Sequence, residues 1–362
     1  MKIDKVTLTN FRNYHKQTLE LGSGIHFIIG ANGEGKTNFL EALYVLALAK
    51  SYKAEDSDLI RFSADFARIQ ATIEKDGRKF ELTMIITEIG KKAMRDSQEI
   101  KRLSDYIGNL NIVSFLPEDI VLIKGAPRDR RYYVDVFLGQ IDKDYLNELT
   151  IYKHILKQRN ELLKKLEYVE KPDYTLLDVI TEQLASSAEK ISQRRVRFQE
   201  EINGLIDGMY KRLSDKDEKF SLVYQQTLPQ KEAYGFLKEK YRQDIMQGAT
   251  GYGPHRDDYV FMLDEFAAGS RASQGEQRMM VLSLNMGLAE LVKETRHETP
   301  VFLLDDVFSE LDETRQNRLL EYVATSGIQT IVTTTGLGGV KDFILKQAHV
   351  FHVNKGYIKE EY

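Results

Sequence analysis

The chain has 362 residues, of which 42% are hydrophobic and 29% are charged, as in an ordinary globular protein, and its formal net charge is −4. The length allows one large domain or two. The absence of cysteine excludes disulfides, thiolate metal sites and cysteine nucleophiles. No signal-like segment opens the chain, and no run approaches the ~20 apolar residues of a membrane span. We therefore expect a soluble cytoplasmic protein that does not contact a membrane.

The N-terminal part predicts strands around one glycine-rich turn. Residues 2–11 alternate like a strand, and the apolar run at residues 24–30 ends in glycine, as a buried strand before a turn does. Residues 38–49 are apolar at helical spacing with no helix breaker. Two alternating runs within residues 66–90 flank Asp76-Gly77, a pair that favours a tight turn, and predict a β-hairpin.

The middle of the chain has a different character. Residues 142–241 are rich in Lys, Glu, Leu, Arg and Gln, with scarce glycine and no clear buried strand. Their long helical segments are interrupted at Lys171-Pro172-Asp173, which predicts a helical hairpin. Strand character then returns in four runs, at residues 257–266, 301–306, 328–335 and 349–358, the last of which predicts a single closing strand.

This order predicts an α/β protein whose main domain is split in sequence. Residues 1–141 would form its N-terminal part and residues 246–362 its C-terminal part, with an α-helical lobe inserted at residues 142–245. We find no internal repeat and no low-complexity tract.

A phosphate-binding loop is predicted between the second strand and the first helix. Gly30, four residues, and then Gly35-Lys36-Thr37 match the pattern G-x-x-x-x-G-K-[ST]. Backbone N–H groups and the helix N-terminus would bind phosphate, with Lys36 on the outer phosphates of ATP and Thr37 on Mg²⁺. A simple glycine turn would leave Lys36-Thr37 unexplained. The predicted nucleotide-binding residues are Gly30, Asn32, Gly33, Gly35, Lys36, Thr37 and Asn38.

Paired carboxylates end a later strand in the sequence VFLLDD, residues 301–306. A nucleotide site of this kind needs a carboxylate at a neighbouring strand end to hold Mg²⁺, and Asp305 fits this role together with Thr37. Asp306 fits the role of a general base that polarises the attacking water. We therefore predict Asp306 and Lys36 as catalytic residues, against the alternative of a solvated acidic pair.

The hexapeptide SQGEQR, beginning at Ser273, precedes a long apolar helix and by itself indicates only a well-capped helix. In this context it resembles the signature motif of ABC-type ATPases, and SELD after the paired aspartates resembles their D-loop. The resemblance implies an ABC-type ATPase head with a mixed or parallel sheet and an antiparallel β subdomain. It also implies that one subunit's signature covers the γ-phosphate bound by the other. The implied signature residues are Ser273, Gln274, Gly275, Glu276 and Gln277, and the implied D-loop residues are Ser309 and Asp312.

More specific blocks resemble the RecF family of bacterial recombination-repair ATPases. These blocks are NFRNY, GANGEGKTNFLEALYVLA, PEDIVLIKGAPRDRRYYVD, GPHRDD and LLDDVFSELD, spread from Asn10 to Asp312. The resemblance implies a slow, switch-like, DNA-dependent ATPase that uses ATP and Mg²⁺. Its head-to-head homodimer would bind gapped or junction DNA when ATP is bound and help to load RecA with RecR and RecO. Hydrolysis would release the dimer.

Some assignments stay open at this stage. Where many ABC-type ATPases have a histidine, this chain offers Thr334 or Thr335. His255 and Arg256 in GPHRDD would lie near the nucleotide or be purely structural. Short basic runs are more often solvated surfaces than binding sites, but they supply the DNA-binding candidates. These are Lys190, Arg194 and Arg197, which can share a helix face, and as second choice Arg128 and Arg130, which would otherwise order the ATP site or the interface.

Two other classes of protein remain as alternatives. The ATPase subunit of a membrane transporter would share the phosphate loop and signature, but would lack the NFRNY and GPHRDD blocks. An SMC-like structural clamp would carry a long coiled coil, whereas the insert here has only about a hundred residues and no sustained heptad.

Overall fold

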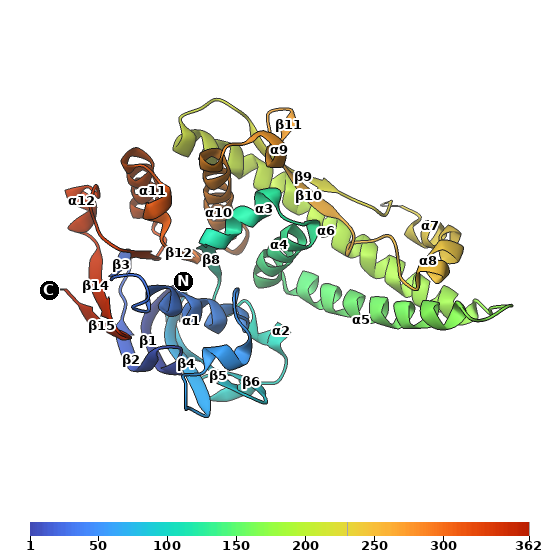
Figure 1. Ribbon diagram of the computed structural model, residues 1–362, viewed down its shortest axis with the longest axis horizontal. Helices are drawn as coiled ribbons and strands as arrows, with labels where there is room; N and C mark the ends of the chain where they lie inside the picture. The colour runs from blue at the N-terminus through green and yellow to red at the C-terminus, as the bar shows by residue number, and fades with distance from the viewer. Residues whose placement is uncertain (230, 362) are drawn as a thin grey trace. The chain divides into compact units, whose positions relative to one another are not determined.

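The computed structural model describes residues 1–229 and 231–361, which form two compact units. The first unit, here called the head, combines the blue N-terminal and red C-terminal parts of the chain in Figure 1. The second unit, here called the lobe, is formed by the middle of the chain. The head is built from Met1–Ile120, Leu205–Glu218 and the chain from Ala272 onward, and the lobe from Val121–Gly204 and Lys219–Arg271.

The head contains a mixed six-stranded sheet in the order β15-β14-β3-β13-β12-β8. Its strands are parallel except for β15, which pairs antiparallel with β14. The central strands are buried along their length, as their apolar sequences predict. The strands are β3 (Ile25–Ile29), β8 (Ile112–Phe115), β12 (Val301–Leu304), β13 (Thr330–Thr334), β14 (His349–Asn354) and β15 (Tyr357–Glu360).

The prediction of a single closing strand at residues 349–358 is wrong. The segment folds back on itself as the β14–β15 hairpin, with Lys355 and Gly356 at its turn in the left-handed backbone region (φ 46° and 78°). Asn354-Lys355-Gly356 is a typical turn sequence. The apolar runs on either side are so short that together they resemble one strand.

A second, antiparallel sheet of the head has the order β2-β1-β4-β5-β6-β7. The predicted hairpin at residues 66–90 is confirmed, and Asp76 and Gly77 both have positive φ at its turn (51° and 71°). The strands are β1 (Lys2–Phe11), β2 (Tyr14–Glu20), β4 (Phe66–Lys75), β5 (Arg78–Thr87), β6 (Gly90–Arg95) and β7 (Gln98–Ile100).

The helix α1 (Lys36–Leu48) packs against β13 of the mixed sheet and against β4 and β5 of the antiparallel sheet. This position between two sheets explains why α1 is apolar nearly all round. The remaining helical segments of the head are α2 (Leu103–Tyr106), α10 (Gln274–Arg296), α11 (Glu313–Ser326), α12 (Asp342–Leu345) and the 3₁₀ turns η1 (Asp56–Leu59), η2 (Pro117–Ile120) and η3 (Val307–Glu310).

In the lobe, α5 (Lys143–Leu166) lies beside and antiparallel to α6 (Thr175–Ser214), whose last residues, from Leu205 on, belong to the head (Figure 1). Arg159 donates to Thr181 near one end of the pair, and Arg195 donates to Tyr145 near the other. The predicted helical hairpin, with its break at residues 171–173, is confirmed. The remaining elements are α3 (Val121–Lys124), α4 (Pro127–Ile141), α7 (Ala233–Glu239), α8 (Tyr241–Gln247), α9 (Ala268–Arg271), β9 (Phe220–Gln225), β10 (Asp258–Leu263) and β11 (Phe266–Ala267).

The lobe is not purely helical, because β9 lies in the segment expected to lack strands and forms a small antiparallel sheet in the order β11-β10-β9. Six residues are too few to stand out from the surrounding helical composition.

The two units are divided at other points than residues 141 and 245. Composition marks the start of the long helices, whereas α4 already packs on β10. The division at 1–141, 142–245 and 246–362 stays a prediction.

Candidate functional site

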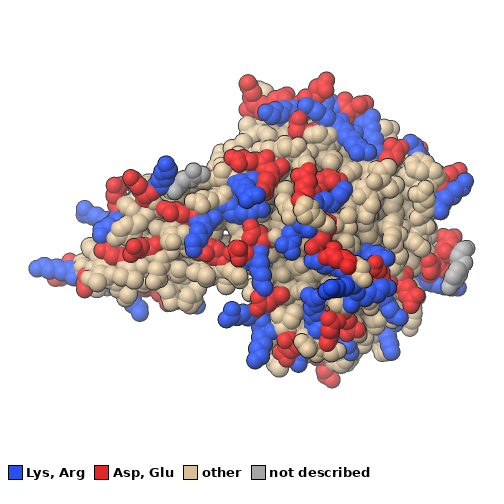
Figure 2. Space-filling model, turned by 180° about the vertical axis from the view of Figure 1, so that it is seen from behind, with Lys and Arg blue, Asp and Glu red and all other residues tan. Residues whose placement is uncertain are grey.

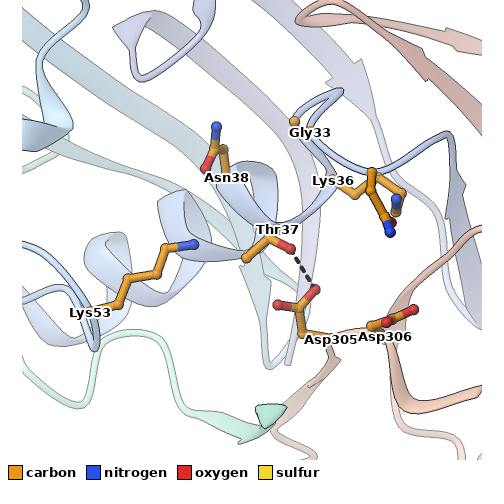
Figure 3. A pocket seen from close by; sticks show the side chains of 9 residues that line it. Gly33, Lys36, Thr37, Asn38, Lys53, Asp305 and Asp306 are labelled. Atoms are coloured by element: carbon orange, nitrogen blue, oxygen red, sulfur yellow. Dashed lines mark hydrogen bonds between the residues drawn. The ribbon is translucent and has the colours of Figure 1, made fainter. Parts of the chain in front are cut away.

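A cavity of about 300 Å³ opens between the loop after β3 and the end of β12 (Figure 3). Predicted residues from both segments line it, so two strands distant in sequence bring their carboxyl ends together on the same side of the mixed sheet. Lys53 also lines the cavity and was not predicted. The lining residues are Asn32, Gly33, Gly35, Lys36, Thr37, Asn38, Lys53, Asp305 and Asp306.

The loop can adopt its shape because glycine occupies the positions where a side chain would clash or where the backbone conformation excludes one. A Cβ atom added at Gly30 would lie 2.6 Å from the carbonyl oxygen of Val353. Gly35 has φ 122°, a conformation that other residues rarely adopt, and immediately precedes α1. The N-terminus of α1 therefore faces the cavity with free N–H groups, as an anion site requires.

Lys36 is buried and turns back onto its own loop. Its ammonium donates to the carbonyl oxygens of Gly30 at 2.7 Å and Ala31 at 3.0 Å. Burial lowers the pKa of Lys36, while the nearby carboxylates of Asp306 and Asp305 raise it. The ammonium thus lies at the cavity wall beside the two acids, in reach of a phosphate placed on the loop.

Asp305 connects the phosphate loop to the mixed sheet. Its Oδ1 accepts hydrogen bonds from the hydroxyls of Thr37 at 3.0 Å and Thr333 at 2.6 Å (Figure 3 draws the first of these). Its backbone N–H donates to Phe115 of β8, which fixes the strand end. The predicted pair Thr37 and Asp305 is therefore brought together. Thr333 was missed because the sequence pattern directed attention to its neighbours. Of these, Thr334 donates to the carbonyl of Gly336 and Thr335 is exposed.

The burial of Asp305 gives a testable pH dependence. Desolvation raises its pKa above the ordinary value, and the hydrogen bonds from Thr333 and Thr37 lower it only in part. The ionised form of Asp305 would hold Mg²⁺. The gain in ATP affinity that Mg²⁺ gives should therefore be largest at high pH, where Asp305 is fully ionised. It should fall by up to about tenfold per pH unit as the pH drops through this raised pKa.

ATP titrations with Mg²⁺ and with EDTA, from alkaline pH down to the lowest pH at which the protein stays folded, measure this difference. Asp305→Asn serves as the control, because the titration of ATP itself is common to both proteins, and it should remove the pH-dependent difference. A Mg²⁺ contribution that stays constant over this whole range in the unsubstituted protein would contradict the expectation.

Asp306 follows in the left-handed backbone region, with φ 47°. Its N–H donates to Thr333 Oγ1 at 2.9 Å, and its carboxylate accepts from the Ser309 hydroxyl at 2.9 Å. Asp312 lies apart from this pair and caps α11 by accepting from the Arg315 N–H at 2.9 Å. The structure thus brings one predicted D-loop residue, Ser309, to Asp306, and gives the other a helix-capping contact.

The signature hexapeptide begins α10 as predicted, and Ser273 and Glu276 cap it reciprocally. Glu276 Oε1 also accepts from Lys216 at 2.6 Å, and this contact, with those to Ser273, lowers the pKa of Glu276 to about 2. Gln274 and Gly275 are exposed, while Gln277 is buried against the carbonyl of Ala272. None of the five signature residues lines the described cavity.

The predicted DNA-binding residues lie among acidic partners. Figure 2 shows blue and red side chains interspersed over the face that it displays, with no purely basic field. Arg128 is exposed and has no ion pair among the described contacts. The other four are paired: Lys190 with Glu148, Arg194 with Asp142 and Glu201, Arg197 with Glu201, and Arg130 with Asp258.

Arg195, between two of these candidates, is fully buried in the lobe. It donates to the Tyr145 hydroxyl at 3.0 Å, to Asp135 at 2.8 Å and to the carbonyl of Pro254 at 2.8 Å. Asp257 lies 3.6 Å from it. The blocks RRYYVD and GPHRDD therefore meet around this guanidinium.

The open question about His255 has a structural answer. Its Nδ1 lies 2.6 Å from the Tyr152 hydroxyl and its Nε2 lies 3.0 Å from the carbonyl oxygen of Thr250. Burial lowers the pKa of His255 to about 4, which keeps the ring neutral. Both partners belong to the lobe, so His255 is a structural residue of the lobe. Arg256 is exposed and, like His255, lies outside the described cavity.

A buried ion pair explains how Lys53 reaches the cavity. Glu41 of α1 accepts two hydrogen bonds from Arg12, each of 2.9 Å, and one from the Ser51 hydroxyl at 2.6 Å. These contacts fix the turn after α1, from which Lys53 approaches the cavity on the side opposite Lys36 (Figure 3). No motif marks Lys53 in the sequence, because a lone lysine after a helix is a common solvated residue.

A phosphate loop between β3 and α1, facing an acid pair after β12, defines a P-loop nucleotide-binding head that is split in sequence by the segments of the lobe. The family model described as RecF/RecN/SMC N terminal domain matches residues 2–359. Proteins named "DNA replication and repair protein RecF" from Staphylococcus carnosus (strain TM300) and Staphylococcus aureus (strain JH9) are 40% and 39% identical over 369 aligned positions. Each alignment covers 99% of this chain and 100% of the relative. The chain belongs to the RecF family.

Solved structures agree with this membership. The "recombination mediator protein RecF-ATP in RecFOR pathway" superposes with a TM-score of 0.90 at 29% identity, covering 99% of this chain and 97% of that one. The corresponding RecF-ATPrS structure gives 0.89 at 28% identity, covering 100% and 98%. An Smc head domain from Pyrococcus furiosus, at 18% identity and a TM-score of 0.57 over 99% of this chain and 95% of that one, shares the fold alone. Membership in the RecF family decides against the transporter subunit.

Proposed function

We propose that this chain is an ATP-dependent recombination mediator that binds DNA as an ATP-bound homodimer. One observation carries the proposal: the head presents a complete phosphate loop and acid pair, yet its signature residues lie outside that cavity. A second copy could supply the signature to the open side of the site. The relatives named as RecF, and the RecF-ATP structure assigned to the RecFOR pathway, support ATP as the nucleotide and DNA repair as the process.

The donor atoms at the cavity fit a hard cation bound together with phosphates. The Thr37 hydroxyl and the Asp305 carboxylate offer oxygens, and the described residues contain no group of three or more His, Cys, Asp or Glu side chains that would form an all-protein metal cage. This suits Mg²⁺, which usually keeps waters and phosphate ligands. Bound there, Mg²⁺ would neutralise developing phosphate charge.

The residues of this chain would then act in distinct roles. Lys36 leaves the carbonyls of Gly30 and Ala31 to contact the outer phosphates, and the loop N–H groups from Gly33 to Asn38 orient them. Asp306 accepts a hydrogen bond from the attacking water and directs it in line, with Ser309 holding the carboxylate. The overall step converts ATP and water to ADP and phosphate.

The partner copy completes the site in this proposal. Ser273 and the exposed N-terminal turn of its α10 would contact the γ-phosphate, which suits the positive end of a helix. The D-loop residues Ser309 and Asp312 would lie at the same interface. Because ATP binds both copies at once, it favours the dimer by mass action, and hydrolysis releases it.

DNA binding follows from the same switch. Joining two copies would combine weak basic surfaces, with Lys190, Arg194, Arg197, Arg128 and Arg130 as candidates, although four of these must exchange carboxylate partners for phosphate. Family membership supports gapped or junction DNA, RecR and RecO as partners and the loading of RecA as the outcome. Because these partners act on bacterial DNA, we place the activity in the cytoplasm. Among the described residues, no helix is long and apolar enough to span a membrane.

Sedimentation of Asp306→Asn with and without ATP tests the proposal. Asparagine tolerates the left-handed backbone at this position, so the fold should persist while hydrolysis stops. We expect an ATP-dependent dimer that ADP does not support. Asp76→Asn makes the same chemical change at φ 51° in the β4–β5 turn and should behave like the unsubstituted protein. A monomer at every ATP concentration would refute the shared site.

A further inference from the structure

The backbone carbonyl of Glu34, in the phosphate loop, accepts hydrogen bonds from both ends of the chain. Asn13 Nδ2, in the turn between β1 and β2, donates at 2.9 Å, and the Gly356 N–H, in the turn between β14 and β15, donates at 3.0 Å. The Lys355 N–H donates to the Glu34 carboxylate as well. One residue of the loop is thus held from outside by two turns more than three hundred residues apart in sequence.

The Asn13 amide also reaches the helix that follows the loop. A carbonyl can only accept, so the Asn13 nitrogen must face Glu34, and this leaves its Oδ1 free to accept. Asn38 Nδ2, in the first turn of α1, donates to that oxygen at 2.9 Å. A single side chain therefore spans from the fifth loop residue to the start of α1.

The neighbouring contacts leave little room for the loop to shift. The Tyr14 hydroxyl donates to the carbonyl of Gly35 at 2.9 Å, and burial raises the pKa of Tyr14, which keeps it a donor. A Cβ atom at Gly35 would lie 2.6 Å from Asn13 Nδ2, and one at Gly356 would lie 2.5 Å from the Asn13 carbonyl oxygen. The loop and the two turns are in direct van der Waals contact.

We propose that Asn13, Tyr14, Lys355 and Gly356, here called the loop clamp, are positioning residues that set the direction of the phosphate-binding N–H groups. In a trans peptide the C=O and N–H point in opposite directions. Holding the Glu34 carbonyl outward therefore aims the Gly35 N–H at the cavity, and holding the Gly35 carbonyl aims the Lys36 N–H likewise. This inference rests on the proposed ATP binding and adds the residues that pre-organise the loop.

Gln17 provides a matched comparison within the same two parts of the chain. It lies in β2, donates to the carbonyl of Ile358 in β15 at 2.9 Å and accepts from the Ile358 N–H at 3.2 Å. It thus joins the N-terminal and C-terminal hairpins by two hydrogen bonds, as Asn13 joins its partners by two. No described contact connects Gln17 to the phosphate loop. Loss of Gln17 therefore measures the structural share of such bonds.

The test compares equilibrium titrations of Mg²⁺-ATP against Asn13→Ala and Gln17→Ala, with thermal unfolding of each nucleotide-free variant. Asn13→Ala should bind ATP about tenfold more weakly, since it removes two neutral hydrogen bonds and leaves the Glu34 carbonyl held by the Gly356 N–H alone. Its KM should rise by a similar factor while kcat at saturating ATP is kept, because bound phosphate restores the loop. Gln17→Ala should bind ATP like the unsubstituted protein, with a similar change in thermal midpoint.

Asn13→Asp sharpens the result, since a carboxylate cannot donate to the Glu34 carbonyl and repels it, and we expect weaker ATP binding than for Asn13→Ala. Equal ATP affinities for Asn13→Ala and Gln17→Ala would overturn the clamp while leaving the proposed function intact. A kcat that falls as far as KM rises would also overturn it. Failure of the unsubstituted protein to bind ATP would refute the proposed function and the clamp together.

Discussion

Mixing two inactive variants, Lys36→Ala and Ser273→Arg, is expected to restore roughly a quarter of the ATP hydrolysis of the unsubstituted protein, by the statistics of random C2 pairing. Lys36→Ala removes the ammonium that faces the phosphates, and Ser273→Arg blocks the N-terminal turn of α10 that the partner's phosphate would contact. Half of the dimers would be mixed, and each mixed dimer holds one site with an intact loop and an intact signature.

Each variant assayed alone supplies the control, since neither can build any complete site. The phosphate assay should therefore show activity only in the mixture, rising to a maximum at equal proportions. Because Ser273 also caps α10, the thermal midpoint of Ser273→Arg should be checked before mixing. A mixture no more active than its components would show that the signature of one chain does not serve the loop of the other.

Replacing Arg195 with alanine is expected to lower the free energy of unfolding by about 3–5 kcal/mol, the usual cost of breaking a buried ion pair. The substitution removes the positive charge beside Asp135 and the fully buried Asp257, and it removes donors from the Tyr145 hydroxyl and the Pro254 carbonyl. Urea unfolding followed by circular dichroism at helical wavelengths gives the measurement.

Arg197→Ala is the matched control, two residues further along the same helix. Arg197 is largely exposed and pairs with Glu201 at 2.7 Å one helical turn away. Loss of such a surface pair should cost no more than about 0.5 kcal/mol. If Arg195→Ala were as mild as Arg197→Ala, the buried network would not hold the lobe together.

The nucleotide site was predictable because its signals are local. The loop pattern lies within eight residues, its strand and helix are adjacent, and the acid pair ends a recognisable apolar run. The convergence of Thr37 and Asp305 depends on the strand order, which places β13 between β3 and β12. Thr333 was missed because its role depends on which face of β13 meets Asp305, and no single-chain pattern shows that pairing.

Contacts between distant segments account for the other misses. NFRNY was a recognisable block, but nothing in it shows that Asn13 would meet the turn at Gly356. The face shared by Lys190, Arg194 and Arg197 was predicted from helix geometry, but the sequence did not show that acidic residues pair with all three or that Arg195 is buried. β9 escaped notice because its partner β10 lies more than thirty residues further on. Each miss concerns a side chain or a strand whose environment is supplied by another part of the fold.

The place of β3 at the centre of the mixed sheet has a consequence for biosynthesis. β3 pairs with β13 on one side and β14 on the other, both made some three hundred residues later. For most of its synthesis the nascent chain therefore carries β3 as an apolar strand with no native partner on either side. The phosphate loop that follows β3 lacks its native contacts during the same time. We expect newly made chains to need protection until residues beyond 356 have emerged, and to acquire nucleotide only then.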